Sequence, residues 1–463
     1  MTVDLAIVNG TVVTPAGPQP LTVAVRQERI VALSDRAHCP AAREILDASD
    51  LHVLPGLVEG HVHFREPGLT QKEDFGSGSA AAVCGGVTTV IDMPNTVPPT
   101  ADAQSLRQKQ ALAEAKSLVD FGLLGVILPN NLRQLRGLVE AGALGLKVFM
   151  GMTVGNLPAP EDGDILEAWR LAAELGIPVA VHAESSVLVH HCTERLRAGG
   201  RSDALAHYEA RPEIAEEEAI QRAILLAAAA GARLHVLHVS TAQGAALVGA
   251  AKRRGGAVSA ETTPHYLLLQ SADAARLGNT MKINPPVRAA GHAEQLWQAL
   301  RGGAIDSIAT DHAPHLPEEK RRRNVWEAPS GFPGVETALP LMLTQVNAGR
   351  MRLEEYVRWH CENPARIWGL YPRKGVIQVG SDADLTLVDL SRRDVIRAAN
   401  LHSKSKVTPY EGWEVQGVPV CTLVRGQIVM REGQLVGRPR GRMLWPSREA
   451  RAGRASDDAA RLA

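Results

Sequence analysis

Short apolar segments alternate with longer segments of helical spacing through the middle of the chain. Eight apolar segments have the length of buried strands, and helical, alanine- and leucine-rich segments separate them. They cover residues 57–63, 87–92, 121–126, 145–149, 178–182, 234–238, 258–261 and 305–310. This order predicts an α/β fold in which residues 55–373 form a (β/α)8 TIM barrel. A doubly wound sheet is the alternative, but polar residues at so many strand ends meet more readily in a closed barrel.

Both ends of the chain show the pattern of short β-strands instead. Residues 1–54 alternate apolar and polar positions, and Asn9-Gly10 predicts a two-residue hairpin turn. A similar pattern returns at residues 384–388 and 421–430. Neither end is long enough to bury a sheet face by itself. We therefore expect residues 1–54 and 374–445 to form one small β-sandwich.

Composition narrows the class of function. The 463 residues exceed the roughly 250–300 that one core usually serves, so more than one domain is expected. The formal net charge is zero, which gives no field for nucleic acid. No apolar run reaches the roughly 18–20 residues of a membrane helix, and the start of the chain lacks a signal-peptide pattern. We expect a cytoplasmic protein that acts on a small molecule and binds neither nucleic acid nor membrane.

Two further features of composition predict structural rather than chemical roles. Five cysteines are scattered along the chain without a Cys-x-x-Cys motif, at Cys39, Cys84, Cys192, Cys361 and Cys421. Such spacing is typical of reduced thiols with a packing role. Residues 446–463 are rich in alanine, arginine and aspartate, and are predicted to be a peripheral tail.

His61 and His63 stand one residue apart at the end of the first predicted strand. Side chains two residues apart lie on the same face of a strand, so both imidazoles could reach one metal ion. The pair alone does not separate a metal site from two ordinary histidines. Further candidate ligands follow at later strand ends, and the predicted set is His61, His63, Lys147, His182, His238 and Asp311. His235 stands three residues before His238, so alternation points it to the other face and predicts a structural role.

Lys147 lies between apolar strand residues, so its ammonium would be buried. Burial of that charge is costly unless it is paired or removed. One solution is a salt bridge. The other is carboxylation by CO2, which converts the cation to a carbamate anion that could bridge two metal ions.

The candidate ligands could hold two divalent metal ions. Zn²⁺ is a suitable metal, because it binds imidazole and carboxylate donors well. Two such ions would lower the pKa of a bridging water and polarise a substrate carbonyl. Asp311 would take the proton of the bridging hydroxide and deliver it to the leaving nitrogen. The predicted reaction is metal-assisted hydrolysis of an amide-like bond.

The charged segment 317–329 directly follows the last of these motifs. It reads either as a solvated loop or as a mobile lid over the active site.

The chain resembles the amidohydrolase superfamily with a two-metal, carboxylated-lysine centre, and within it the dihydroorotases. The resemblance rests on the six candidate ligands and on residues 61–68, 92–96, 283–288, 309–315 with Lys320, and 331–338. It covers nearly the whole chain, including the split β-sandwich. It implies a metal-dependent enzyme of pyrimidine biosynthesis that interconverts dihydroorotate and N-carbamoyl-aspartate. It also implies self-association as a dimer or tetramer.

The same resemblance implies a set of substrate contacts. Arg65, Asn95 and His315 would hold the substrate carboxylate, since a guanidinium, an amide and an imidazole can surround an anion with donors. Asn284 and the backbone at Ser330 and Gly331 would contact the ring. Arg65 could instead pair with Glu66 or Glu73, and Asn95 could be a turn residue.

Three features depart from the dihydroorotase pattern. Glu59 stands where those enzymes usually have aspartate, and Lys147 stands where many bacterial ones have aspartate. Residues 210–220 are more similar to allantoinases and hydantoinases. An allantoinase or a hydantoinase- or dihydropyrimidinase-like cyclic amidase is therefore the alternative substrate assignment. A non-catalytic scaffold is the alternative of another class, and the presence of all six candidate ligands argues against it.

Overall fold

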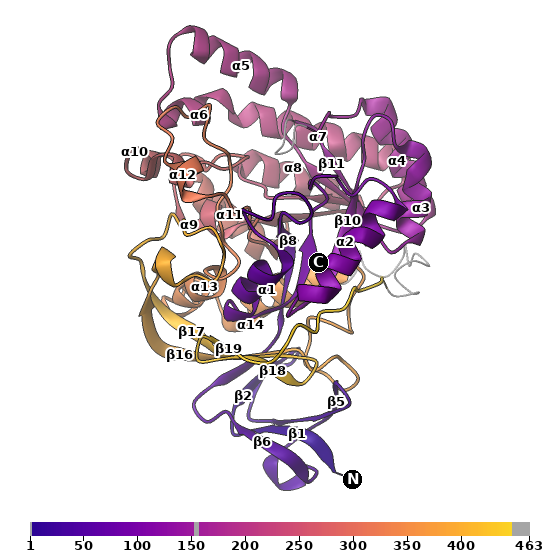
Figure 1. Ribbon diagram of the computed structural model, residues 1–463, viewed down its shortest axis with the longest axis vertical. Helices are drawn as coiled ribbons and strands as arrows, with labels where there is room; N and C mark the ends of the chain where they lie inside the picture. Colours follow the sequence, from indigo (N-terminus) through magenta and orange to yellow (C-terminus); the bar gives the residue numbers. More distant parts are fainter. Residues whose placement is uncertain (1, 152–156, 447–463) are drawn as a thin grey trace.

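The computed structural model describes residues 2–151 and 157–446, and an eight-stranded parallel sheet forms its centre (Figure 1). The strands are β8 Leu57–Val62, β9 Val87–Asp92, β10 Asp120–Val126, β11 Gly145–Phe149, β12 Val179–His182, β13 Leu234–Val236, β14 Val258–Thr262 and β15 Ser307–Ile308. They lie side by side in chain order. Every residue of β8 to β12 is buried, as expected for parallel strands covered on both faces.

The sheet closes on itself at its carboxyl end. The amide of His63 donates to the carbonyl of His312 at 2.8 Å, and the amide of His312 donates to the carbonyl of His61 at 3.3 Å. Val62 and His312 thereby form a parallel bridge between β8 and the segment after β15. The predicted (β/α)8 barrel is confirmed, and its closing contact lies among the candidate ligands.

Helices surround the barrel (Figure 1). They are α1 Phe75–Cys84, α2 Ala103–Lys116, α3 Leu135–Glu140, α4 Asp162–Glu174, α5 Ser186–Ala198, α6 Ala204–Ala210, α7 Glu213–Ala230, α8 Ala242–Arg253, α9 Pro264–Leu268, α10 Ala274–Leu277, α11 His292–Arg301, α12 Pro317–Lys320, α13 Ala338–Asn347, α14 Leu353–Val357 and α15 Asn363–Ile367. Local signals fix where several begin. At the start of α1 the Asp74 side chain accepts a hydrogen bond from the Ser77 amide, and the Ser77 hydroxyl oxygen accepts one from the Asp74 amide. This reciprocal pair is a capping box.

The two ends of the chain build two further sheets beside the barrel (Figure 1). One contains β1 Val3–Val8, β4 Thr22–Arg26, β5 Arg29–Ser34 and β6 Ala42–Asp47; the other contains β2 Thr11–Thr14, β3 Gly17–Gln19, β7 His52–Pro55, β16 Leu385–Val395, β17 Glu414–Val424, β18 Gln427–Arg431 and β19 Gln434–Leu435. Strand β7 pairs with β16, so the amino-terminal and carboxyl-terminal pieces share one sheet. The sandwich from both ends is confirmed, and we propose domain boundaries after residues 54, 373 and 445.

The hairpin prediction at Asn9-Gly10 is wrong. Strand β1 pairs with β4 and β6, whereas β2 pairs with β3 and β7 in the other sheet. The turn therefore carries the chain from one sheet to the next. Asn9 has a φ of 65°, and a Cβ added at Gly10 would lie 2.9 Å from the Cβ of Ala48. The tight turn was correctly identified, but its local sequence does not specify which strands pair.

A buried ion-pair cluster joins the sandwich to the amino-terminal end of the barrel. The ammonium of Lys374 lies 2.6 Å from Asp120 on β10 and 3.0 Å from Asp382. Residues 440–445 then run along β10, where the Leu444 amide donates to the Phe121 carbonyl at 2.8 Å. The predicted tail at 446–463 lies outside the described residues except for its first position. Among the helices in the described ranges, none has the length and apolarity to span a membrane.

Candidate functional site

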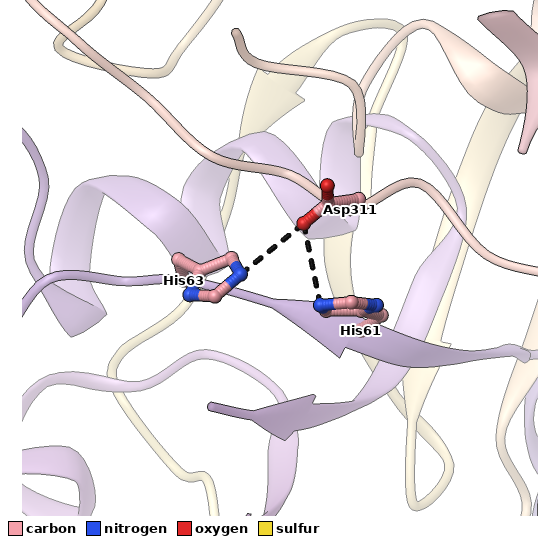
Figure 2. A group of neighbouring side chains, drawn as sticks. All are labelled: His61, His63 and Asp311. Atoms are coloured by element: carbon pink, nitrogen blue, oxygen red, sulfur yellow. Dashed lines mark hydrogen bonds and ion pairs between the residues drawn. The ribbon is translucent and has the colours of Figure 1, made fainter. Parts of the chain in front are cut away.

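The carboxyl end of the barrel holds a cavity that all six predicted metal ligands line. Asp311 lies between the two histidines of β8: its Oδ1 is 3.2 Å from His61 Nε2 and 3.1 Å from His63 Nε2 (Figure 2). Asp311 has a φ of 47°, in the left-handed region that non-glycine residues rarely adopt. Such a conformation at a site is often kept because it directs a side chain.

A second group of donors lies beside the first. His182 Nδ1 at the end of β12 faces His238 Nε2 at 3.0 Å, and the ring centroids of His61 and His238 are 5.4 Å apart. His238 also has a positive φ, of 41°. The two groups come from four different strand ends, so closure of the barrel brings together residues that are 250 positions apart in the chain, such as His61 and Asp311.

Outer acceptors fix the orientation of three of these imidazoles. His61 Nδ1 donates to Glu261 at 2.7 Å, His63 Nδ1 to Asn95 Oδ1 at 2.8 Å, and His182 Nε2 to Glu184 at 3.0 Å. The other nitrogen of each ring faces Asp311 or His238 across the cavity. This arrangement, in which the far N–H of a histidine is held by an oxygen, is typical of histidine metal ligands.

Burial favours the neutral form of three of these histidines. It lowers the pKa of His63 to about 3 despite the neighbouring Asp311, and it lowers the pKa values of His182 and His238. Burial alone would raise the pKa of Asp311, but His61 and His63 hold it well below its usual value. These three imidazoles and the carboxylate of Asp311 thus favour the protonation states that bind a divalent cation.

Lys147 ends in the same cavity and is fully buried. Its ammonium has no hydrogen-bond partner among the described residues and lies 4.6 Å from the centroid of the Phe149 ring. Burial lowers its pKa to about 7, so a large fraction is uncharged near neutral pH. The structure does not contain the salt bridge that was one of the two predictions for this lysine. An unpaired amine among neutral imidazoles and one carboxylate fits the donor set of a metal centre.

Two acidic residues of the site were missed by the sequence analysis. Glu261 on β14 accepts from both His61 and His235, the latter at 3.1 Å, and these imidazoles hold its pKa at about 2 against the effect of burial. Glu184 likewise accepts from His182 and pairs with Arg211. His235 does not line the cavity; it supports Glu261. A carboxylate inside an apolar strand was the available signal for Glu261.

The predicted substrate residues Arg65, Asn95, Asn284, Ser330 and Gly331 line the same cavity. Phe149, Ile283 and Ala313 add an apolar wall. The space within this lining, including its mouth toward solvent, is about 440 Å³. Gly331 is required at its place, because it has a φ of 125° and a Cβ there would lie 2.5 Å from the Ala313 carbonyl oxygen.

Arg65 is 1% exposed and forms neither of the alternative ion pairs. Its Nε donates to the Pro314 carbonyl at 3.4 Å, while Nη1 has no hydrogen-bond partner in the described ranges. Burial lowers its pKa to about 10, so the guanidinium stays charged at neutral pH. The candidate partners are engaged elsewhere, Glu66 with Lys116 and Glu73 with Ser403. A buried guanidinium with an unused donor beside a cavity suits an anionic ligand group.

His315 does not lie where the prediction placed it. It is absent from the cavity lining, and both ring nitrogens are engaged behind Arg65: Nε2 with the Ser330 carbonyl at 3.0 Å and Nδ1 with the Lys72 ammonium at 3.0 Å. Its Nε2 is also 3.3 Å from Arg65 Nη2. The imidazole therefore packs against the guanidinium as a support. A sequence motif identifies such a residue but not the side of the cavity wall on which it stands.

The segment 317–329 is anchored rather than freely solvated. Lys320 is buried and donates to the carbonyls of Lys282 and Pro329, each at 3.0 Å. The ammonium of Lys282 in turn donates to the Val325 carbonyl at 2.6 Å. Only part of the segment, including residues 321–323, is exposed. The solvated-loop prediction applies to that part alone, and the lid stays a prediction.

Three comparisons give the site a context. The model of the amidohydrolase family matches residues 52–429. The structure of L-hydantoinase (dihydropyrimidinase) from Arthrobacter aurescens is similar with a TM-score of 0.93 and 38% identity, over 95% of this chain and 99% of that one. An allantoinase from Deinococcus radiodurans is 39% identical over 96% of this chain and 99% of its own length. A dihydroorotase from Methanothermobacter thermautotrophicus is 40% identical over 90% of this chain and 92% of its own.

Glu261→Gln tests the outer support of the site. The amide keeps the size of the side chain but cannot accept from His61 and His235 as a charged carboxylate does, so His61 is held less firmly and its basicity falls. We expect divalent-cation affinity to fall about 10–100-fold. Competitive titration with a coloured chelator measures this, and Glu174→Gln, at an exposed ion pair on α4, serves as the control. If the Glu261 variant binds the cation with unchanged affinity, this carboxylate does not contribute to metal binding.

Proposed function

The chain belongs to the amidohydrolase family, and from that premise we propose that it is a metal-dependent hydrolase of cyclic amides. The observation that carries the proposal is the convergence of six donors in one cavity beside a small apolar wall. The same convergence argues against a non-catalytic scaffold, because a scaffold has no use for a buried lysine that lacks a hydrogen-bond partner among the described residues and is costly to bury.

We propose His61, His63, Lys147, His182, His238 and Asp311 as the residues that hold two divalent cations, with Zn²⁺ the best match to imidazole and carboxylate donors. The cations would supply an activated water and polarise the ring carbonyl. The uncharged fraction of Lys147 is the form that reacts with CO2, so its low pKa and its lack of a partner support a carbamate at this position.

Asp311 is the proposed proton carrier. Its carboxylate is ionised and lies beside both histidines of β8, so it can take a proton from the attacking water and release it to the ring nitrogen that leaves. Water is added across the C–N bond of the ring amide, and the ring opens to a carboxylate and an amide or ureide nitrogen. Asn284, whose Oδ1 has no partner among the described residues, can accept a hydrogen bond from a ring N–H.

Within this class we propose dihydroorotase activity, the reversible conversion of dihydroorotate to N-carbamoyl-aspartate. The support is the free Nη1 donor of the buried Arg65, since dihydroorotate carries a carboxylate on its ring. Asn95 lines the same cavity and accepts from His63 Nδ1 through its Oδ1, and we propose it as a second residue near that carboxylate. His315 would act through Arg65 rather than by touching the substrate.

An allantoinase or hydantoinase is the second candidate. It is favoured by the similarity to the L-hydantoinase structure and to the Deinococcus allantoinase over nearly the whole chain. The substrates of these activities also contain a cyclic amide or ureide, so the metal centre does not distinguish them. The difference lies in the group that meets Arg65.

A substrate panel decides between the candidates. We expect purified, metal-loaded protein to hydrolyse dihydroorotate faster than allantoin, hydantoin or dihydrouracil, as followed by ring absorbance and by product chromatography. Turnover of allantoin or an uncharged hydantoin without turnover of dihydroorotate would reject the dihydroorotase assignment and keep the amidohydrolase one. If fully metal-loaded protein hydrolyses none of the four substrates, both the dihydroorotase assignment and the allantoinase or hydantoinase assignment are rejected.

Arg65→Met tests the anion contact. Methionine keeps much of the buried volume but removes the charge, so kcat/KM for dihydroorotate should fall. The expected loss of transition-state stabilisation, calculated from the ratio of the two kcat/KM values, is about 2–4 kcal/mol. Any residual activity toward an uncharged cyclic amide should change far less, which makes it the internal control. An unaltered kcat/KM for the carboxylated substrate would remove Arg65 from the binding role.

Lys147→Ala tests the carbamate. Wild-type apoprotein reconstituted in bicarbonate should take up more metal than apoprotein reconstituted without CO2, because the carbamate supplies a bridging anion. The alanine variant should show no bicarbonate dependence, and short carboxylic acids should partly restore its metal content. Elemental analysis measures all three. If the wild-type protein has the same metal content after reconstitution with and without CO2, a bridging role for Lys147 is refuted.

A further inference from the structure

A second cluster of metal-binding side chains lies outside the cavity. Cys84 ends α1, Glu336 lies just before α13, and His402 lies in the segment between β16 and β17. One ligand atom from each of these three residues lies within 4.8 Å of the others. The three segments are far apart in sequence, so the fold alone brings them together. None of these residues has a place in the proposed reaction.

The geometry between Cys84 and His402 matches a shared cation. Cys84 Sγ lies 3.7 Å from His402 Nε2. In a tetrahedral zinc site, with bonds of about 2.3 Å to sulfur and about 2.0–2.1 Å to nitrogen, the two ligand atoms stand roughly 3.6 Å apart. The observed separation therefore needs little adjustment to accept an ion.

Glu336 already orients the imidazole for this role. Its Oε1 accepts from His402 Nδ1 at 2.8 Å, and its Oε2 accepts from the His402 backbone amide at 2.7 Å. The hydrogen bond to Glu336 raises the pKa of His402, so the neutral ring forms at higher pH. In that neutral ring, a proton on Nδ1 leaves the lone pair of Nε2 toward the thiol. A carboxylate that holds the far nitrogen of a histidine is the usual outer support of a metal ligand.

The cluster is reachable from solvent. The side chain of His402 is 29% exposed and that of Glu336 is 15% exposed, whereas Cys84 lies just beneath them at 8%. Without an ion, burial and the charge of Glu336 raise the pKa of the Cys84 thiol, so it stays protonated. A bound cation reverses this balance, because a coordinating thiol loses its proton.

We propose that Cys84 and His402, supported by Glu336, form a third cation site that binds a zinc-class ion through a thiolate. The donors are softer than those of the main cavity, which offers nitrogen and oxygen only. One backbone contact links a neighbour of this cluster to a neighbour of the main site. Val335, next to Glu336, donates its amide to His312 Nδ1 at 3.3 Å, and His312 follows Asp311.

Cobalt substitution tests the site independently of catalysis. A thiolate bound to Co²⁺ gives a charge-transfer band in the near ultraviolet, which nitrogen and oxygen ligands do not. We expect metal-free wild-type protein titrated with Co²⁺ to bind one ion beyond the main-centre content and to develop this band, because the lining of the main cavity contains no thiol. Cys84→Ser should abolish the band, and Cys421→Ser, a buried thiol on β17, should retain it.

His402→Gln provides a second variant, since its partly exposed side chain can be changed with less risk to folding. It should weaken the additional cobalt binding at least tenfold and leave the main-centre metal content unchanged. A third ion without the band, a band that survives Cys84→Ser, or no binding beyond the main centre would each overturn the proposal. None of these results depends on which substrate the enzyme hydrolyses, so failure here is separable from failure of the proposed function.

Discussion

One buried carboxylate underlies the geometry of the site. Glu59 on β8 accepts the amide of His61 at 3.0 Å and the amide of Thr310 at 2.9 Å, and its other oxygen is 3.3 Å from His360 Nε2. It thereby ties the first barrel strand to the segment that carries Asp311. A carboxylate fully removed from water is tolerated only when its oxygens are satisfied in this way. Glu59 stands where dihydroorotases usually have aspartate. In this structure it helps to close the barrel beside the proposed metal ligands.

Behind the ligands, charges are paired in layers. Glu184 supports His182 and is itself paired with Arg211, while Arg288 donates to the Arg211 carbonyl at 2.6 Å and to Glu216 at 3.0 Å. Breaking one member of such a buried network leaves an uncompensated charge, which costs more than the pair contributes. The network therefore holds the His182 imidazole in place through Glu184. Paired and packed residues around a site hold its reactive side chains in position.

In the proposed function, substrate choice depends on a different part of the same cavity. Arg65, which His315 contacts and Lys72 reaches through His315, would set the charge that a ring substituent meets. Lys72 is balanced by Glu319 on α12 at 2.8 Å, so the anchored segment 317–329 contributes to this support. Proteins similar to this chain over nearly its whole length carry the names hydantoinase, allantoinase and dihydroorotase. The proposed metal centre would serve several ring substrates, and the proposed contact at Arg65 would discriminate among them.

The sequence by itself determined the eight barrel strands, the sandwich built from both ends and the set of polar residues at strand ends. These follow from local rules: the period of two along a strand, the length of apolar runs, and the position of polar residues just after them. It did not determine that Asn9-Gly10 joins two sheets, that His315 stands behind Arg65, or that Glu261 and Glu184 hold the histidines. Nor did it bring Cys84 next to His402. Except for Glu184, which stands two residues after His182, each of these depends on contacts between segments tens to hundreds of residues apart. Only closure of the barrel and docking of the sandwich decide which distant side chains meet.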